Sequence, residues 1–357
     1  MKQNQREFRI AVVSGDGIGP EITVQAVRVI ARAAERYHFS CRFDEYLFGG
    51  CSIDRFGTPL TEEVLLSCRQ SDAVLLGAVG GPEWEYSTHR PEEGLLRLRK
   101  ELAAYTNLRP VRLYAALQEA SPLKDRILKQ GIDIMIVREL MGGMYFSRSG
   151  RDAHSAYDTE HYEAYEIDRV LRQGFEIAGK RRGKLCLVDK ANVLESSKLW
   201  RECFWNMAEQ YPEVSVSTLY VDNAAMQLIL HPEQFDVIVT SNMFGDILSD
   251  EAAVLSGSIG LLPSASIGSG GPGIYEPIHG SAPDLAGKNT ANPIGSILSA
   301  AMLLRYSIGC EAGAAAIEAA VEHILEQGYR TADIYTGEPG TRLLGTNEIG
   351  EWIAGEI

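Results

Sequence analysis

The sequence predicts an α/β protein with substantial parallel sheet, because short strand-like runs alternate with helical patterns along the whole chain. Apolar runs typical of buried strands occur at residues 8–14, 73–77, 133–137, 185–188 and 236–240. Helical patterns lie between them at residues 21–37, 94–104 and 123–129. The polar and aromatic segment 147–161 has no helical period, so we expect an arm or an excursion that packs on a partner subunit.

Length, net charge and cysteine content limit the classes of function that the chain can have. A length of 357 residues predicts two domains or one large α/β unit. The net charge of −14 argues against nucleic acid as a partner, so an anionic substrate needs a local arginine cluster. Six scattered cysteines without a CxxC pair are typical of reduced thiols, and the polar start carries no secretory signal, so we expect a cytoplasmic protein. The apolar run 297–304 predicts a buried helix rather than a membrane span.

The glycines at Gly15, Gly17 and Gly19 follow the first strand and invite comparison with a dinucleotide-binding turn. Their spacing is G-x-G-x-G and not G-x-G-x-x-G, and no acidic residue ends a second strand at the expected distance. The sequence therefore predicts a tight strand-to-helix turn and not a Rossmann fold.

Two carboxylates, Asp246 and Asp250, stand four residues apart after the strand at 236–240. On a helix both would project from one face at the carboxyl end of a sheet, where they could share Mg²⁺ or Mn²⁺. An isolated pair with this spacing is more often a solvated acidic face of a helix. Asp222 is a third candidate ligand, and alone it could also be a helix N-cap.

Acid–base candidates follow two other strands. Lys190 comes after the strand at 185–188, where desolvation would make a lysine a usable general base. Asn192 beside it could hold substrate or nicotinamide. Tyr145 follows a glycine pair that permits unusual backbone angles and could donate a proton. A surface lysine and a packing aromatic remain the alternatives.

Three arginines in three elements, Arg99, Arg109 and Arg138, could converge on a dicarboxylate, because guanidinium groups bind carboxylates through paired hydrogen bonds. Individually each is compatible with a structural or surface role, and the sequence alone does not establish convergence.

The segment 279–293 is a polar, glycine-punctuated loop that carries Asp284. Such a loop can wrap an adenosine, with backbone groups at the base and the carboxylate at the ribose. A carboxylate there accepts hydrogen bonds from both ribose hydroxyls and repels a 2′-phosphate, so it favours NAD over NADP. By itself the segment could also be an ordinary surface loop.

Taken in order, these motifs resemble the isocitrate/isopropylmalate dehydrogenase family of β-hydroxyacid oxidative decarboxylases, and within it the isopropylmalate enzymes. The matching segments are 15–21, 94–100, 107–110, 137–146, 188–193, 244–250 and 279–293. The resemblance implies a two-domain α/β fold, not a Rossmann fold, with an active-site cleft between the domains. Residues 1–103 with 257–357 would form a cofactor-side domain. Residues 104–256 would form a substrate and dimerisation domain, with the arm near 147–161 interlocking in a homodimer.

The resemblance further implies NAD-dependent oxidative decarboxylation of 3-isopropylmalate to 4-methyl-2-oxopentanoate, CO₂ and NADH, in leucine biosynthesis, with Mg²⁺ or Mn²⁺. It assigns catalysis to Tyr145, Lys190 and Asp222, and the metal to Asp246, Asp250 and Asp222, with Lys190 and Asp222 contributed by the second subunit. The substrate contacts it implies are Glu92, Leu95, Leu96, Arg99, Arg109, Arg138, Val193 and Asp222. The cofactor contacts it implies are Ile18, Gly81, Glu92, Asn192, His279, Gly280, Ser281, Ala282, Pro283, Asp284 and Asn292.

The resemblance also implies that substrate choice depends on the start of the helix at 94–104, where this chain has Leu95 and Leu96. Two leucines suit an isopropyl group and would leave a third carboxylate unpaired, which argues against isocitrate. Tartrate and methylmalate are rival substrates, and the loop 83–90 departs from the family pattern. A catalytically silent, nucleotide-binding subunit is the alternative from another class, but it should lack part of the acid–base and metal set that this chain retains in full.

Overall fold

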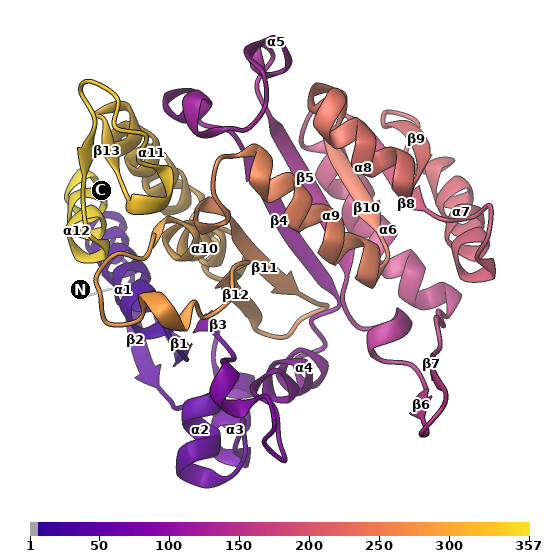
Figure 1. Cartoon of the computed structure of the whole chain (residues 1–357), viewed down its shortest axis with the longest axis horizontal. Helices are drawn as coiled ribbons and strands as arrows, with labels where there is room; N and C mark the ends of the chain where they lie inside the picture. Colours follow the sequence, from indigo (N-terminus) through magenta and orange to yellow (C-terminus); the bar gives the residue numbers. More distant parts are fainter. Residues whose placement is uncertain (1–5) are drawn as a thin grey trace. The chain divides into compact units, whose positions relative to one another are not determined.

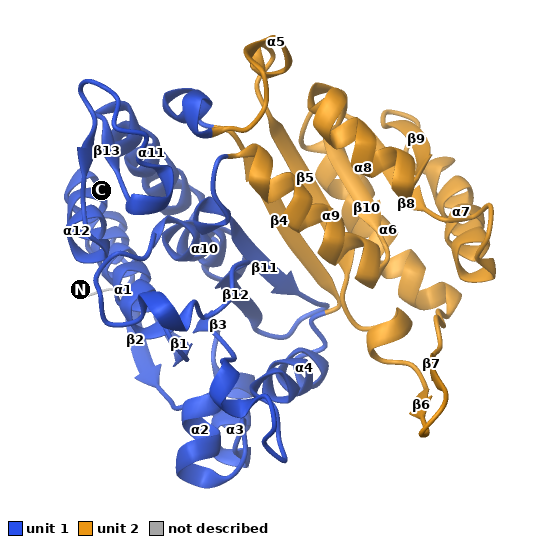
Figure 2. Ribbon diagram, in the orientation of Figure 1, with its two compact units in different colours: residues 1–104, 114–120, 257–357 blue, residues 105–113, 121–256 orange. Residues whose placement is uncertain are grey.

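The computed structural model describes residues 6–357, which divide into two compact units. The first unit joins the chain up to Ala104 with Tyr114–Ala120 and Gly257–Ile357, and the second comprises Tyr105–Leu113 and Ser121–Ser256 (Figure 2). The chain thus crosses between the units at several points, and the short stretch Tyr114–Ala120 groups with the first unit although it lies within the range that the sequence assigned to the second domain.

The first unit is built on a sheet with strand order β2-β1-β3-β12-β11, in which β11 alone runs antiparallel to its neighbour β12. Its strands are β1 Glu7–Gly15, β2 Ser40–Glu45, β3 Ala73–Ala78, β11 Pro263–Ile267 and β12 Gly273–Pro277, with the small pair β13 Tyr329–Arg330 and β14 Arg342–Leu343. Its helices are α1 Gly19–Tyr37, α2 Gly50–Phe56, α3 Glu62–Gln70, α4 Pro91–Glu101, α10 Ile294–Leu303, α11 Glu311–Glu326 and α12 Thr346–Glu356. Short helical turns complete the unit: η1 Pro82–Trp84, η2 Ala115–Ala120, η5 Ile259–Leu261, η6 Pro283–Leu285, η7 Leu304–Ile308 and η8 Ala332–Ile334.

The second unit contains a sheet with strand order β4-β5-β10-β8-β9, parallel except for β4 against β5. Its strands are β4 Thr106–Arg112, β5 Asp133–Glu139, β8 Lys184–Asp189, β9 Ser215–Tyr220 and β10 Val237–Thr240. The helices are α5 Asp125–Leu128, α6 Ala164–Gly179, α7 Glu195–Ala208, α8 Val221–Leu230 and α9 Asn242–Leu255, with short turns η3 Gly143–Tyr145 and η4 Pro232–Gln234 (Figure 1). Segment 147–161 forms a separate two-stranded ribbon of β6 Ser149–Arg151 and β7 Ala156–Asp158.

Alternation along the strands explains how each sheet acquires two covered faces. In β5, Arg138 contacts α9, whereas the next side chain, Glu139, lies near Arg169 of α6. In the first unit, Ala11, Val13 and other alternate residues pack into a core with α3 and α4. Helices α1 and α10 pack against each other and against strands of the same sheet, including β3, β11 and β12. The α/β architecture predicted from the alternating pattern is therefore confirmed.

Local predictions differ in how well their boundaries hold. The glycine turn after β1 is tight as predicted, with φ of +73° at Gly15 and +56° at Gly17. The bounds predicted for the helix at 94–104 are about three residues too late. Helix α4 begins at Pro91, because proline fits the first helical turn, and it ends at Glu101, shortly before Ala103, whose φ is +50°. The run 297–304 falls mainly in α10, every residue of which is buried. No helix within residues 6–357 is long and apolar enough to cross a membrane.

Candidate active site

The candidate catalytic residues of the second unit lie where its parallel strands end. Strands β5, β8, β9 and β10 end at Glu139, Asp189, Tyr220 and Thr240. Their carboxyl ends share one edge of the sheet, and antiparallel β4 brings Asn107 to that edge opposite Arg138. Ligand sites of α/β sheets collect at this edge. The sequence therefore delivers its charged residues there from several separate segments.

One face of α9 organises the site. Its residues Asn242, Gly245, Asp246, Ser249 and Asp250 are spaced at three and four residues, so they lie along one side of the helix. The helix begins directly after β10, with Ser241 as the N-cap residue in extended conformation. The predicted i, i+4 aspartate pair is therefore part of a longer polar stripe that faces β4 and β5.

Arg138 lies along this stripe. Its guanidinium contacts an Asp246 oxygen, with Nη1 to Oδ1 at 2.5 Å, and donates to Asn242 Oδ1 from Nε at 3.2 Å and Nη2 at 2.8 Å. Its aliphatic stem passes so close to Gly245 that an added Cβ would lie 2.6 Å from Arg138 Cγ. Only glycine at 245 leaves room for this arrangement, and the 3% exposed arginine is fixed at its stem and its head.

Arg109 reaches the same stripe from β4. Its Nη1 donates to Ser249 Oγ at 2.5 Å, while its guanidinium lies 3.4 Å from Asp246 and 3.6 Å from Asp250. Its Nε donates to Asn107 Oδ1 at 2.7 Å. The structure therefore brings together two of the three predicted arginines and both aspartates, because one guanidinium touches both carboxylates.

Tyr145 joins this cluster through the glycine pair before it. Gly143 has φ of +69°, and an added Cβ at Gly142 would lie 2.5 Å from the ring of Tyr162, so both positions require glycine. The hydroxyl of Tyr145 donates to Asp246 Oδ2 at 3.2 Å, and Arg138 lies 5.8 Å from the ring centroid. Partial burial, and secondly the negative charge of Asp246, raises the pKa of Tyr145, which keeps the phenol protonated.

Lys190 and Asp222 form a second cluster at the carboxyl ends of β8 and β9. The Lys190 ammonium donates to Asp222 Oδ1 at 2.6 Å, and this hydrogen bond lowers the pKa of the carboxyl. Asp222 lies in the first turn of α8, whose N-cap is Tyr220, so the alternative that Asp222 caps the helix is wrong. Asn192 and Val193 lie in the turn that directly follows Lys190, and Val193 is 64% exposed.

The stripe on α9 suits a hard divalent cation by its donor chemistry. Asp250 is a half-exposed carboxylate whose pKa is raised by burial and, against the opposing effect of Arg109, by the charge of Asp246. A cation between the two aspartates would favour the ionised form of Asp250 and so oppose both effects. Within residues 6–357, however, no group of three acidic, histidine or cysteine side chains gathers to hold a metal. One chain thus offers two of the three predicted ligands in one place.

The remaining predicted substrate contacts lie in the first unit, on or near α4. Arg99 forms a largely buried ion pair with Glu276 of β12 at 2.7 Å. Leu95 packs against the hydrophobic core of the unit, so its side chain is partly committed there, whereas Leu96 is half-buried outside that cluster. The exposed Glu92 carboxylate lies beside Gly80, next to the predicted cofactor contact Gly81.

The loop 279–293 is held chiefly through backbone atoms. Ile18 of the glycine turn donates its N–H to the Ser281 carbonyl at 2.8 Å. Glu21, in the first turn of α1, accepts hydrogen bonds from the N–H groups of Gly287 and Asn289, the latter at 3.1 Å. Asn289 has φ of +54° and bonds the start of α12 through its side chain and carbonyl. The turn after β1, helix α1 and helix α12 thus fix the shape of the loop together.

The side chains predicted to meet the cofactor differ in their freedom. Asp284 is exposed and makes no ion pair with residues 6–357. His279 contacts the Gly280 carbonyl through Nδ1 at 2.9 Å, and burial lowers its pKa, which favours the neutral ring. Asn292 donates to Asp333 at 3.0 Å and accepts from the Ile294 N–H. Ala282 takes a left-handed conformation with φ of +39° before the exposed Pro283.

Among the residues of these networks that the sequence analysis missed are Glu21, Asn242 and Asn289. Asn242 could have been found, because it stands four and eight residues before Asp246 and Asp250, on the same helical face. Glu21 was hidden because an acidic residue in the first helical turn is an ordinary favourable feature. Asn289 was missed because an asparagine in a polar loop does not reveal from the sequence which residues it contacts.

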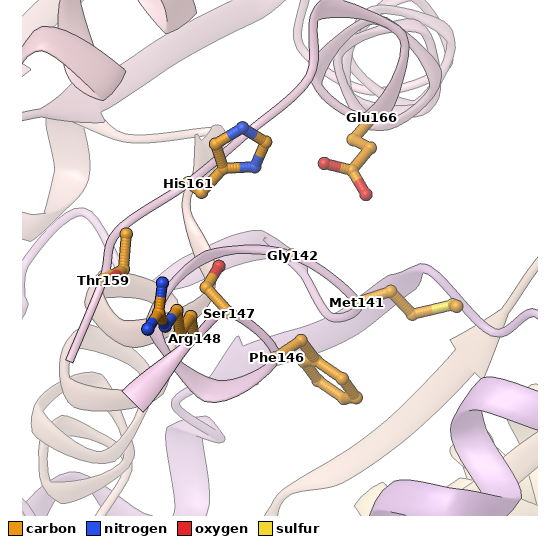
Figure 3. A pocket seen from close by; sticks show the side chains of 8 residues that line it. All are labelled: Met141, Gly142, Phe146, Ser147, Arg148, Thr159, His161 and Glu166. Carbon is orange, nitrogen blue, oxygen red and sulfur yellow. The ribbon is translucent and has the colours of Figure 1, made fainter. Parts of the chain in front are cut away.

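A pocket of about 380 Å³ borders the Tyr145 turn through Gly142, at the base of the β6–β7 ribbon (Figure 3). It is lined by Met141, Gly142, Phe146, Ser147, Arg148, Thr159, His161 and Glu166. None of the predicted site residues lines it. Its lining mixes one carboxylate with basic and hydroxyl groups, so it does not define one ligand chemistry.

Comparison with known proteins places these observations in a family. Residues 9–353 match the family model described as isocitrate/isopropylmalate dehydrogenase. A 3-isopropylmalate dehydrogenase of Clostridium acetobutylicum is 52% identical over 99% of this chain and 100% of its own length, and one of Moorella thermoacetica is 55% identical over 98% and 99%. Among solved structures, isocitrate dehydrogenase from Methylococcus capsulatus is 31% identical with a TM-score of 0.87, covering 98% of this chain and 99% of its own.

Proposed function

The chain belongs to the isocitrate/isopropylmalate dehydrogenase family, and from this premise we propose that it converts 3-isopropylmalate and NAD⁺ to 4-methyl-2-oxopentanoate, CO₂ and NADH in leucine biosynthesis. The observation that carries the proposal is the α9 stripe, where Arg109 and Arg138 meet Asp246 and Asp250 beside Tyr145. This arrangement combines carboxylate recognition, hard-cation ligands and a proton donor within a few ångströms.

Substrate recognition falls to the arginines. In the proposal, Arg109 and Arg138 bind carboxylates of the substrate from the second unit, and Arg99 contributes from the first. Leu96, the less committed of the two leucines, and the exposed Val193 supply apolar surface for the isopropyl group, with Leu95 behind them. Glu92 lies on the same helix as the leucines and is assigned to the rim of the substrate and nicotinamide sites.

The proton transfers are assigned to two residues. Lys190, acting as its neutral amine, accepts the proton of the substrate hydroxyl, and the Asp222 carboxylate, 2.6 Å from Nζ, stabilises the ammonium that results. Tyr145, whose raised pKa keeps its proton, protonates the carbon left by loss of CO₂. Asp246, Asp250 and Asp222 from a second copy of the chain would hold Mg²⁺ or Mn²⁺. When bound, the cation supplies Lewis-acid polarisation of the substrate oxygen, and the nicotinamide supplies the hydride acceptor.

The cofactor is assigned to the loop 279–293, with Asp284 at the ribose and Ile18, Gly81 and Asn192 toward the nicotinamide. Support comes from the exposed carboxylate of Asp284, which makes no ion pair within residues 6–357, and from the open surroundings of Gly280, where no atom of the described residues lies within 4 Å of an added Cβ. A carboxylate at this place favours NAD over NADP because it repels a 2′-phosphate. On this basis we regard the first unit as the cofactor-side domain.

A homodimer completes the proposal. Helices α8 and α9, which pack together, expose a set of apolar side chains: Met226, Ile229, Leu230, Ile247 and Val254. A second copy of the chain would cover this face, since scattered single exposures are normal but a two-helix apolar face favours an interface. The dimer would also bring Lys190 and Asp222 of one subunit to the α9 stripe of the other.

The test is NADH formation, followed by absorbance, with purified protein, NAD⁺, Mg²⁺ and 3-isopropylmalate. Isocitrate, tartrate, methylmalate and malate are run in parallel, and light scattering reports the oligomeric state. We expect turnover on isopropylmalate that EDTA abolishes and a dimeric mass. Turnover on another hydroxy acid alone would contradict the assignment of Leu96, and a folded protein that binds NAD without any turnover would contradict the enzymatic function.

A further inference from the structure

Asn242, the first residue of α9, lies where three parts of the candidate site meet. Its side chain contacts Arg138 of β5 and the Gly142 carbonyl in the turn before Tyr145, and its helix carries Asp246 one turn later. We propose that Asn242 is a positioning residue for the reaction, which holds the Arg138 guanidinium and the Tyr145 turn in register with α9. The inference rests on the proposed function and adds to it a residue that touches neither substrate nor cofactor.

The acceptor side of the amide fixes Arg138. Asn242 Oδ1 accepts from both Nε and Nη2 of Arg138, at 3.2 Å and 2.8 Å. Because two of its N–H groups are directed at one oxygen, the guanidinium is held in one orientation. In that orientation Nη1 points toward Asp246 Oδ1 at 2.5 Å. Asn242 thus supplies two of the hydrogen bonds that orient the Arg138 guanidinium.

The donor side of the amide fixes the turn. Asn242 Nδ2 donates to the Gly142 carbonyl at 3.1 Å, while the buried carboxylate of Glu139 accepts the N–H groups of Met141 and Gly142 at 2.8 Å and 2.7 Å. The Asn242 N–H also donates to the hydroxyl of Tyr162, the ring that packs under the glycine pair. The turn is thus held by hydrogen bonds to both its N–H and its C=O groups. Asn242 supplies the hydrogen bond that comes from α9, the helix of the proposed metal ligands.

The chemistry of the two partners leaves few substitutes for asparagine. Arginine offers only donors, and a carbonyl only accepts, so the orientation of the amide is determined by its neighbours. An aspartate of the same shape could serve Arg138 but would set an anionic oxygen against the Gly142 carbonyl. An alanine would serve neither. At 1% exposure, Asn242 cannot replace a lost partner with bulk water.

Two substitutions separate the contact with Arg138 from the contact with the Gly142 carbonyl. In Asn242→Ala, both are lost: we expect the KM for isopropylmalate to rise about tenfold or more and kcat to fall about tenfold, with the KM for NAD⁺ unchanged. In Asn242→Asp, only the donor is lost: kcat should fall about tenfold, while the KM for isopropylmalate stays within about threefold of the original. Asn206→Ala and Asn206→Asp, on the exposed side of α7, are the matched controls with the same chemical changes.

A double-mutant cycle tests whether the kcat effect passes through Tyr145. The losses of kcat in Asn242→Ala and Tyr145→Phe should be strongly non-additive when combined, because both disable the same proton donor. A purely structural role predicts additive losses and parallel changes in both KM values, which would overturn the inference, as would folded variants that match the original enzyme. If the alanine variant does not fold, the isosteric aspartate variant decides alone through its split between kcat and KM.

The original enzyme is assayed beside the variants. No turnover of isopropylmalate by the original enzyme contradicts the proposed function. An active original enzyme with indifferent Asn242 variants contradicts only the positioning role.

Discussion

The α9 stripe and the loop 279–293 are held in shape by opposite means. In the stripe, side chains bind side chains: Arg109 contacts Asp246 and Asp250, and Arg138 contacts Asp246. In the loop, backbone groups bind the protein, through Glu21, Ile18 and Asn289, and the functional carboxylate of Asp284 is left exposed.

This difference predicts how each region responds to change. A substitution in the stripe removes a group that both holds its neighbours and acts on the substrate, so its effect on turnover should be large. A substitution behind the loop shifts a backbone that many hydrogen bonds still support, so its effect should be graded and limited to the cofactor. The Lys190–Asp222 pair is also held by contacts between side chains, so its loss should have a large effect as well.

Removing Lys190 should have the largest effect. We expect Lys190→Ala to lower kcat by about 10²–10⁴-fold, because it removes the proposed acceptor of the hydroxyl proton. Asp222 would remain, but a carboxylate is a far weaker base than an amine. Steady-state turnover measures the loss, and Lys198→Ala, an exposed lysine on α7, is the control. Near-normal turnover in Lys190→Ala would exclude it as the base.

Arg109 tests recognition by the stripe. Arg109→Lys keeps the charge but loses the fork that now spans Ser249, Asp246 and Asn107. The KM for isopropylmalate should rise roughly 10–100-fold, while the KM for NAD⁺ stays unchanged. Arg172→Lys, on the exposed face of α6, controls for the substitution itself. Equal changes in both constants would mean that Arg109 supports the fold rather than the substrate.

These two regions were also unequally predictable from the sequence. The aspartate pair on one helical face follows from spacing alone, and the strand ends follow from hydrophobic runs. The meeting of Arg109 with Arg138 does not, because it depends on the antiparallel register that sets Asn107 opposite Arg138. The loop was recognised by composition, but its supports were not. Glu21 and the start of α12, which Asn289 bonds, are distant from the loop in sequence, and these contacts involve backbone atoms that no side-chain pattern reports.

The support behind the loop should give a graded effect. Glu21→Gln keeps one carbonyl acceptor but turns an N–H₂ group toward an N–H of Gly287 or Asn289, so one hydrogen bond is lost. The KM for NAD⁺ should rise about fivefold, with kcat and the KM for isopropylmalate unchanged. Glu35→Gln, on the exposed face of α1, is the control. A fall in kcat as large as that of a stripe variant would contradict the division between the two regions.

The smallest effect concerns stability and comes from the stripe itself. The pKa of Asp250 is raised by burial and by Asp246, so the folded protein carries this charge at a cost above that pKa. Because a raised pKa contributes stability only below the unfolded value and loses it as pH rises through the folded value, Asp250→Asn should raise Tm at neutral pH in EDTA. The gain should be about 1–2 °C, since the carboxylate is half-exposed and screened.

Adding Mg²⁺ to the same melts should reverse the order, because a cation that binds the pair stabilises the original protein and not the variant. At a pH below the unfolded pKa of aspartate, the two proteins should melt alike. A variant that is less stable than the original at neutral pH in EDTA would mean that the arginines more than offset the cost of the charge. The stripe would then be complete without a cation, and the acidic pair would be structural rather than a metal site.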